Sequence, residues 1–206
     1  MKNILLINAS PQGAASEANR LARELLACLQ RRHPDRPVTE RDLARQPLPP
    51  LTASYAHALT KVTPFEAPEF AESEALIREL EGSERVLIAT PMHNFTVPAA
   101  LKLWLDYVLR IHRTFQATPE GKVGLLVDRP VYVLVGSGGF HRGERARQPD
   151  FLTPYLRHAL ATMGLFDVHF VYLEGLVFGE QATAAALAAA RAQLALEPDF
   201  QDLEPA

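Results

Sequence analysis

The chain has 206 residues, of which 48% are hydrophobic and 22% are charged, and its formal net charge is -3. This length favours one domain, and the composition is typical of a globular protein with a hydrophobic core. A charge of this size leaves no basic excess to neutralise phosphates, which argues against nucleic acid as the main partner.

The cellular compartment is indicated by the cysteine content and by the apolar runs. Cys28 is the single cysteine, so no intramolecular disulfide is possible, which fits a reducing compartment. The apolar run at residues 3–9 is cut by Ser10 and Pro11, too early for a signal peptide. No run approaches the ~20 apolar residues of a membrane span. We therefore expect a cytoplasmic protein with no membrane partner.

The first elements of the chain follow a strand–helix–strand pattern. Residues 3–8 are almost continuously apolar, as in a central parallel strand covered on both faces. Apolar residues recur on one face of a predicted helix at 17–32. Residues 37–43 predict an edge strand. The proline-rich stretch 46–70 is either an overhang above a site or a surface excursion, and a helix is expected at 71–81.

The central part of the chain contains an unusually apolar predicted helix. A third strand is expected at residues 85–89, followed by this helix at 97–111. Its polar residues Lys102, Asp106 and Arg110 are four apart and predict one solvent-facing stripe. Because contact with a sheet needs only one apolar face, the remaining apolar surface requires another cover. That cover is either a twofold partner, giving a homodimer, or the protein's own loops.

The second half completes the alternation. Residues 114–127 predict a hairpin-like excursion rather than a crossover. Strands are expected at 130–135 and 168–173, and helices at 151–163 and 181–196.

These elements predict an α/β fold with a doubly wound, five-stranded parallel sheet and helices on both faces. The expected strand order is 2-1-3-4-5, as in flavodoxin-like proteins. We expect residues 1–206 to form one domain, with a loosely attached tail from about residue 197.

Three unusual loops follow the first, third and fourth strands. The first carries Ser10, Gly13 and Ser16 before a helix, which suits a terminal phosphomonoester or serves only as a capping loop. The second is the stretch 90–98, and the third is the glycine-rich 136–139, which allows a flat ligand close to the backbone or is simply a flexible turn. In the 2-1-3-4-5 order these loops lie side by side at the FMN position of flavodoxin-like folds.

Several short motifs together resemble one enzyme family. They are Ser10-Pro11-Gln12-Gly13 with Ser16, Pro91-Met92-His93-Asn94-Phe95 followed by Pro98 and Leu101-Lys102, Thr114-Phe115, Gly124-Leu125-Leu126, Gly138-Gly139, and Pro154-Tyr155-Leu156 with Glu174-Gly175. From about residue 1 to 180 the chain resembles the FMN-dependent NADH:azoreductases, also called NADH:quinone oxidoreductases. The resemblance implies a homodimer with FMN at the subunit interface. It also implies ping-pong electron transfer from NADH or NADPH to quinones and azo compounds, with reductive cleavage of the azo bond to amines.

The resemblance also assigns site residues. Ser10 and the segment Ser16, Glu17 and Ala18 would hold the FMN phosphate. Pro91, Met92, His93, Asn94 and Phe95 would line the flavin ring, while Gly136, Ser137, Gly138 and Gly139 would hold its far edge. Phe115 is a candidate wall of the acceptor pocket. No catalytic residue beyond the flavin is required, and no metal-ligand spacing occurs.

Two positions depart from the family pattern. Ala18 stands where many members have serine, which would remove one phosphate hydroxyl and weaken FMN binding. His93 stands where tyrosine is usual; its side chain either only shapes the pocket or hydrogen-bonds flavin or substrate. In the second case, His93 and Asn94 would orient the ligand and activity would depend on pH near neutrality. His141, beside the glycine loop, is a weaker candidate.

Two other functions fit the same fold. One is a flavodoxin that carries single electrons to protein partners, and the other is a flavin-binding regulator without NAD(P)H turnover. The mild charge and the very apolar helix at 97–111 argue against the carrier. No basic cluster indicates whether NADH or NADPH is preferred.

Overall fold

Five parallel strands form the central sheet in a computed structural model that describes residues 2–203. They are β1 (Asn3–Asn8), β2 (Val38–Asp42), β3 (Ser83–Pro91), β6 (Val131–Gly136) and β7 (Val168–Leu173). Their order is β2-β1-β3-β6-β7, and each neighbouring pair is parallel. This confirms the expected order 2-1-3-4-5 when the strands of this sheet alone are numbered.

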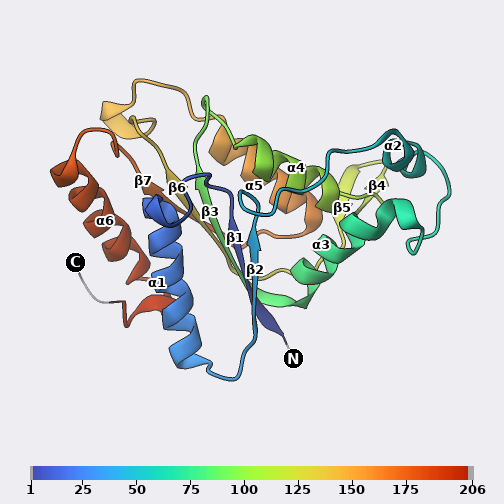
Figure 1. Ribbon diagram of the computed structural model, residues 1–206, viewed down its shortest axis with the longest axis horizontal. Helices are drawn as coiled ribbons and strands as arrows, with labels where there is room; N and C mark the ends of the chain where they lie inside the picture. Colours follow the sequence, from blue (N-terminus) through green and yellow to red (C-terminus); the bar gives the residue numbers. More distant parts are fainter. Residues whose placement is uncertain (1, 204–206) are drawn as a thin grey trace.

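Helices cover both faces of the sheet. They are α1 (Glu17–Arg32), α2 (Ala53–Leu59), α3 (Ala71–Gly82), α4 (Ala99–Val108), α5 (Leu152–Met163) and α6 (Glu180–Leu194), with short 3-10 turns at Gly13–Ala15, Pro68–Phe70, Gly143–Arg145 and Pro198–Phe200. Figure 1 shows α1 and α6 on one face and α3, α4 and α5 on the other. The molecule is therefore a three-layer sandwich with the sheet in the middle.

The alternation of side chains along the strands builds two separate cores. In β1, Leu5 and Ile7 join the core beneath α3, α4 and α5, while Ile4 and Leu6 join the core beneath α1 and α6. Successive side chains of a strand point to opposite faces, so a strand buried on both sides must be apolar throughout. The apolar runs that predicted the strands follow from this requirement.

An antiparallel hairpin leaves the sheet layer after α4. It consists of β4 (Phe115–Thr118) and β5 (Gly121–Gly124), which confirms the excursion expected within residues 114–127. Gly124 lies against the end of α5, where an added Cβ would be only 2.1 Å from the Gly164 nitrogen. The glycine therefore permits the hairpin to pack closely on α5.

The proline-rich stretch 46–70 contacts α4 through Tyr107. Tyr107 of α4 donates its hydroxyl to the Pro49 carbonyl at 2.9 Å, and its ring contacts Tyr55 of α2 edge-on at 5.2 Å. Loops of the same chain thus cover this side of the apolar helix. The surplus apolar surface near Tyr107 consequently needs no partner subunit.

The boundaries of α4 differ from the expectation at both ends. The helix begins at Ala99 rather than 97, and Pro98 occupies the position before it without a side-chain hydrogen bond to the helix. It ends at Val108, so Arg110 lies beyond the helix and not on the stripe formed by Lys102 and Asp106. Arg110 is 1% exposed instead of facing solvent.

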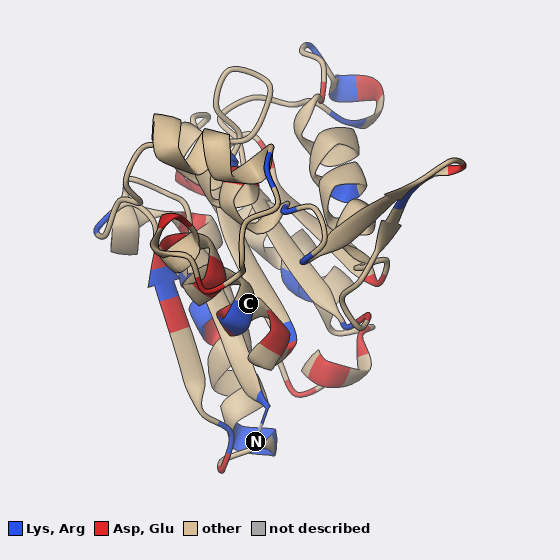
Figure 2. Cartoon of the chain, turned by 90° about the vertical axis from the view of Figure 1, so that its right-hand side faces the viewer, with Lys and Arg blue, Asp and Glu red and all other residues tan. Residues whose placement is uncertain are grey.

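The surface carries both signs of charge. Figure 2 shows acidic and basic residues on the same elements, with no continuous field of either sign on the side in view. Among residues 2–203, no helix is both long and apolar enough to cross a membrane, and no group of three or more His, Cys, Asp or Glu side chains is arranged to hold a metal ion.

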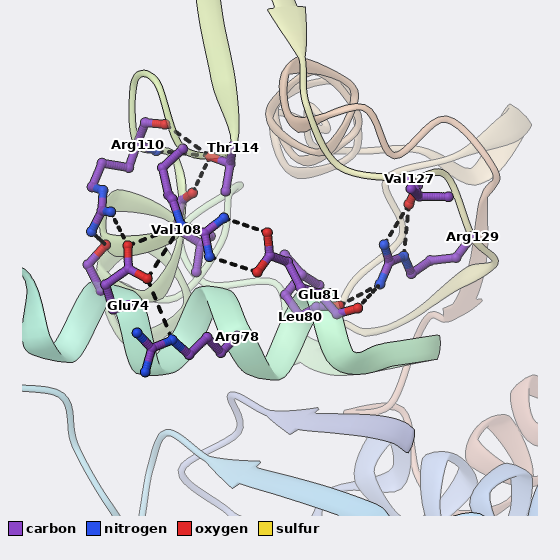
Figure 3. Close-up of polar contacts among 11 residues, drawn as sticks. Glu74, Arg78, Leu80, Glu81, Val108, Arg110, Thr114, Val127 and Arg129 are labelled. Atoms are coloured by element: carbon purple, nitrogen blue, oxygen red, sulfur yellow. Dashed lines mark hydrogen bonds and ion pairs between the residues drawn. The ribbon is translucent and has the colours of Figure 1, made fainter. Parts of the chain in front are cut away.

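Arg110 belongs to a buried ion network between α3 and the segment that follows α4 (Figure 3). Its guanidinium pairs with Glu74 and donates to the Ser73 hydroxyl at 3.1 Å. Arg113 pairs with Glu74 at 3.1 Å and with Glu81. Nearby, Arg129 donates to the carbonyl of Leu80 at 2.6 Å, which satisfies a group at the end of α3. It also donates to the carbonyl of Val127 at 2.7 Å.

The ion pair between Arg113 and Glu81 predicts a pH-dependent contribution to stability. Arg113 donates to both Glu81 oxygens and holds the pKa of that carboxyl below its ordinary value. A carboxyl whose pKa is lower in the folded state stabilises above its unfolded pKa, and the stabilisation is lost as pH falls through the folded pKa. Glu81→Gln should therefore lower the free energy of unfolding at neutral pH and lose this effect at an acidic pH below the folded pKa of Glu81, measured with urea.

Glu120→Gln provides the control, because Glu120 is exposed at the hairpin tip. It should change the free energy of unfolding at neither pH. A deficit of the Glu81 variant that persisted unchanged in acid would contradict an electrostatic origin.

The expected looseness from about residue 197 is wrong for residues 197–203. Phe200 is fully buried and its ring contacts Tyr132 edge-on at 4.7 Å, while Asp199 pairs with Arg85 at 2.6 Å. Burial of an aromatic ring and a partly buried ion pair attach this segment to the sheet. The remaining part of the predicted tail, residues 204–206, lies outside the described residues.

Candidate functional site

Loops at the carboxyl ends of β1, β3 and β6 enclose a cavity of about 360 Å³. Its lining consists of Ser10, Pro11, Gln12, Ala15, Ser16, Glu17, Pro91, Met92, His93, Gly136, Ser137, Gly138, Leu176, Val177 and Thr183. The three loops singled out by the sequence therefore meet around one space, at the point where open α/β sheets bind ligands.

One end of the cavity has the features of a phosphate site. Ser10 and Ser16 are buried in its wall, and Ser16 also caps α1 by accepting from the Asn19 amide at 3.4 Å. The amides of Glu17 and Ala18 lie in the first turn, where a helix has no carbonyl partners for its N–H groups. The Glu17 carboxylate is paired with Arg20, which offsets its charge beside an anion.

Two asparagines that the sequence reasoning missed hold this end in shape. The Asn8 side chain accepts from the Ser10 amide at 3.0 Å, and the Asn19 side chain donates to the Gly13 carbonyl at 2.9 Å. Both are buried, at 2% exposure each. An asparagine at a strand end, or inside a helix three residues after its cap, is the signal that would have identified them.

The loop after β3 is a tight turn with an unusual backbone. His93 and Thr96 exchange two hydrogen bonds, at 2.9 and 3.0 Å, and Asn94 and Phe95 between them have φ of 47° and 74°. Asparagine tolerates a positive φ, but it is costly for phenylalanine, and such strain recurs at functional sites.

This turn decides which amides of the loop are free. The Met92 amide donates to the Gly136 carbonyl at 2.8 Å, and the His93 amide is used within the turn. In the described part of the chain, the amides of Asn94 and Phe95 have no hydrogen-bond acceptor. The amides of Met92 and His93 are thus engaged within the protein, whereas those of Asn94 and Phe95 are not.

The glycine loop after β6 approaches the next crossover closely. A Cβ on Gly138 would lie 2.8 Å from a Val177 methyl carbon, so only glycine fits without movement. Ser137 is buried and donates its hydroxyl to the Gly139 carbonyl at 2.6 Å. The loop therefore packs closely against the segment between β7 and α6.

His141 is buried behind the glycine loop. Its Nδ1 lies 3.1 Å from a Glu174 carboxylate oxygen and 3.2 Å from the Ser137 hydroxyl. The same Glu174 oxygen accepts from the backbone amides of His141 at 2.7 Å and Arg142 at 3.1 Å. Glu174 thereby fixes the end of the loop.

Most of the predicted site residues line this cavity, and some do not. Ser10, Ser16, Glu17, Pro91, Met92, His93, Gly136, Ser137 and Gly138 line it, whereas Ala18, Asn94, Phe95, Gly139 and Phe115 do not. The Ala18 side chain is buried, so only its amide is available to a ligand there. Phe115 lines a separate cavity of about 180 Å³ with Lys122 and Tyr155.

The segment after β7 contributes three lining residues that the sequence reasoning missed, Leu176, Val177 and Thr183. Val177 is 72% exposed, which is unusual for an aliphatic side chain and consistent with a ligand-facing position. The only sequence signal was the preceding pair Glu174-Gly175.

The lining matches the chemistry of FMN. Hydroxyls and free helix amides at one end suit a phosphate, and a glycine backbone opposite Met92 and His93 suits a flat ring. A flavin mononucleotide contains this combination of an anionic end and a planar end.

Comparison with known proteins gives consistent results. Residues 2–196 match the family model of the flavodoxin-like fold. The chain is 66% identical to FMN-dependent NADH:quinone oxidoreductase 4 of Pseudomonas fluorescens, over 98% of each chain. It is 57% identical to FMN-dependent NADH:quinone oxidoreductase 5 of Burkholderia lata, over 95% of this chain and 94% of the relative. Among solved structures, an azoreductase of Bacillus anthracis superposes with a TM-score of 0.79 at 26% identity, covering 92% of this chain and 97% of that one.

Proposed function

Because the chain belongs to the family of FMN-dependent NADH:quinone oxidoreductases, we propose that it passes electrons from NADH or NADPH to quinones and to azo compounds by a ping-pong mechanism. The observation that supports this most is the single cavity lined by all three loops. FMN, when bound, accepts the electron pair of the reduced nicotinamide and passes it to the acceptor. A quinone consumes one pair, and an azo bond cleaved to two amines consumes two.

In this proposal, the residues of the chain bind FMN and orient it. The Ser10 and Ser16 hydroxyls and the first-turn amides of α1 hold the phosphate. Met92 and His93, which line the cavity, would lie beside the ring. Gly136, Ser137 and Gly138 would support its far edge. His93 forms a wall that the acceptor contacts.

We further propose a homodimer of single-domain subunits. Phe95 and Phe151 are 45% and 58% exposed and adjacent, since the Phe151 amide donates to the Phe95 carbonyl at 3.0 Å. Exposed aromatic side chains beside a site favour cover by a second subunit. A dimer mass in light scattering supports this proposal, and a monomer mass at micromolar concentration contradicts it.

We propose a cytoplasmic location from the electron donor, NADH or NADPH, and from the free Cys28. NADH and NADPH are intracellular reductants, and the free thiol of Cys28 is stable in a reducing compartment.

The decisive experiment follows the FMN-loaded protein anaerobically. Addition of NADH should bleach the flavin absorbance, and benzoquinone or methyl red, added separately, should restore it. Initial rates at several concentrations of both substrates should then give parallel double-reciprocal lines, as in ping-pong kinetics. If FMN binds but NADH leaves it oxidised, the electron-carrier or regulatory function replaces this one.

A further inference from the structure

Three arginines lie in the segment 142–147, which follows the glycine loop of the FMN cavity. They are Arg142, Arg145 and Arg147, and all three residues are exposed. Within residues 2–203, none of their guanidinium groups forms an ion pair with a carboxylate. Glu144 is the single acid of the segment. The segment is therefore basic, and its positive charges are not neutralised by ion pairs.

Two of these guanidinium groups are held on aromatic rings. The Arg142 guanidinium lies over the Tyr172 ring at 3.8 Å, and the Arg145 guanidinium lies over the Phe140 ring at 4.0 Å. A ring beneath its face positions a guanidinium but leaves the N–H groups, which lie in the guanidinium plane, free to donate. Arg147 differs, because it donates to two carbonyls of its own turn at 2.9 and 3.1 Å. In the described part of the chain, the side chains of Arg142 and Arg145 have no hydrogen-bond acceptor.

Contacts through Phe140 connect Arg145 to the rim of the FMN cavity. The Phe140 ring stacks on the Phe178 ring, with 5.5 Å between centroids and 5° between planes. Phe178 follows Val177, which lines the cavity, and both residues are exposed, at 63% and 72%. A ligand held by Arg145 therefore lies outside the cavity, on the side of the glycine loop and of the segment after β7.

This position suits a second molecule that carries phosphate. The proposed site of the FMN phosphate lies at the start of α1, with Ser10 and Ser16, so FMN itself does not need these arginines. The electron donors NADH and NADPH carry a diphosphate several bonds away from the nicotinamide ring, and NADPH has an additional phosphate on its adenosine ribose. Guanidinium groups are well suited to phosphate because they donate two parallel hydrogen bonds to its oxygens.

Resting on the proposed function, we propose that Arg142 and Arg145 bind the phosphate groups of the reduced nicotinamide dinucleotide while its nicotinamide enters the cavity. The two arginines then determine how tightly the donor binds and take no part in binding a quinone, which has no phosphate. The aromatic rings beneath them hold the guanidinium groups in place before the donor arrives, which reduces the entropy lost on binding.

Neutral variants of the two arginines test this proposal. Arg142→Gln and Arg145→Gln retain an apolar stem on the ring but remove the charge. At saturating benzoquinone, the double variant should have a KM for the donor raised about tenfold, with kcat and KM for benzoquinone unchanged. Arg157→Gln is the matched control and should change none of these values. Its guanidinium also lies over a ring, that of Phe170 at 4.9 Å, but it donates to a carbonyl at the amino end of β7.

Comparison of the two donors shows which phosphate is bound. An equal rise in KM for NADH and NADPH would assign the arginines to the diphosphate, and a rise for NADPH alone would assign them to the ribose phosphate. Calorimetric titration of the FMN-loaded protein with ADP-ribose and with 2′-phospho-ADP-ribose provides a readout without turnover. The double variant should bind the second probe about tenfold more weakly than wild type does in either case.

Unchanged KM values for both donors in the double variant would overturn the proposal. A loss of FMN affinity, measured by flavin fluorescence, with unchanged binding of both probes would also overturn it, since the arginines would then belong to the FMN site. Failure of the proposed function appears separately, as wild-type protein that binds the probes through these arginines but never oxidises NADH or NADPH.

Discussion

Replacement of Glu74 by glutamine is expected to lower the free energy of unfolding by about 3–5 kcal/mol. Glu74 lies on α3 with its side chain 8% exposed and pairs with Arg110, which is 1% exposed, and with Arg113. Removing the carboxylate charge leaves the Arg110 guanidinium buried without a counter-ion. Its remaining contacts, the Ser73 hydroxyl and the rings of Phe70 at 4.4 Å and Phe65 at 5.3 Å, are weaker substitutes.

Urea unfolding of the FMN-free protein measures this effect. Arg78→Gln is the matched control, because Arg78 approaches the same Glu74 at 3.7 Å but is 70% exposed. Arg78→Gln should lower the free energy of unfolding by less than about 1 kcal/mol. Combining Glu74→Gln with Arg110→Met should cost less than the sum of the two single changes, since the second removes the charge that the first leaves unpaired. If Glu74→Gln and Arg78→Gln lowered the free energy of unfolding equally, burial would not determine the strength of the ion pair between Glu74 and Arg110.

Local patterns were sufficient to predict the sheet and the first site loop. β1 and α1 have the expected bounds. An unbroken apolar run and a helix with one apolar face are both visible in a short stretch of sequence, without knowledge of distant contacts. The site's position follows from topology alone, since ligands bind at the carboxyl ends of strands where the strand order reverses. The position of Ser10 and Ser16 in the cavity lining could therefore be predicted without any knowledge of side-chain contacts.

Long-range contacts explain what the sequence did not predict. A four-residue spacing placed Arg110 on a helix stripe, but α4 ends at Val108 and the partner, Glu74, lies on another helix. Similarly, Val177 has the composition of a core residue, and only the crossover after β7 places it at the cavity. Phe200 is buried by the sheet rather than by its own segment. None of these positions has a local signal.

The largest effect on function is expected from Ser16→Asp. Ser16 is the N-cap of α1 and lies in the wall of the FMN cavity. Aspartate caps helices as well as serine does, so the fold should retain its stability. Its negative charge, however, would lie where the proposed phosphate binds. We expect FMN affinity to fall about 100-fold or more, which corresponds to ~2.7 kcal/mol.

Ser16→Asn separates charge from shape in this prediction. Asparagine is an equally good cap and is nearly the size of aspartate, but it is neutral, so its FMN affinity should stay within about tenfold of wild type. Both affinities are measured by flavin fluorescence titration, and urea unfolding without FMN should give three similar stabilities. Raising the salt concentration should recover part of the binding to the aspartate variant, since charge repulsion is screened. If the aspartate and asparagine variants bound FMN equally well, the phosphate would not lie at the start of α1, and the proposed orientation of FMN in the cavity would have to be reversed.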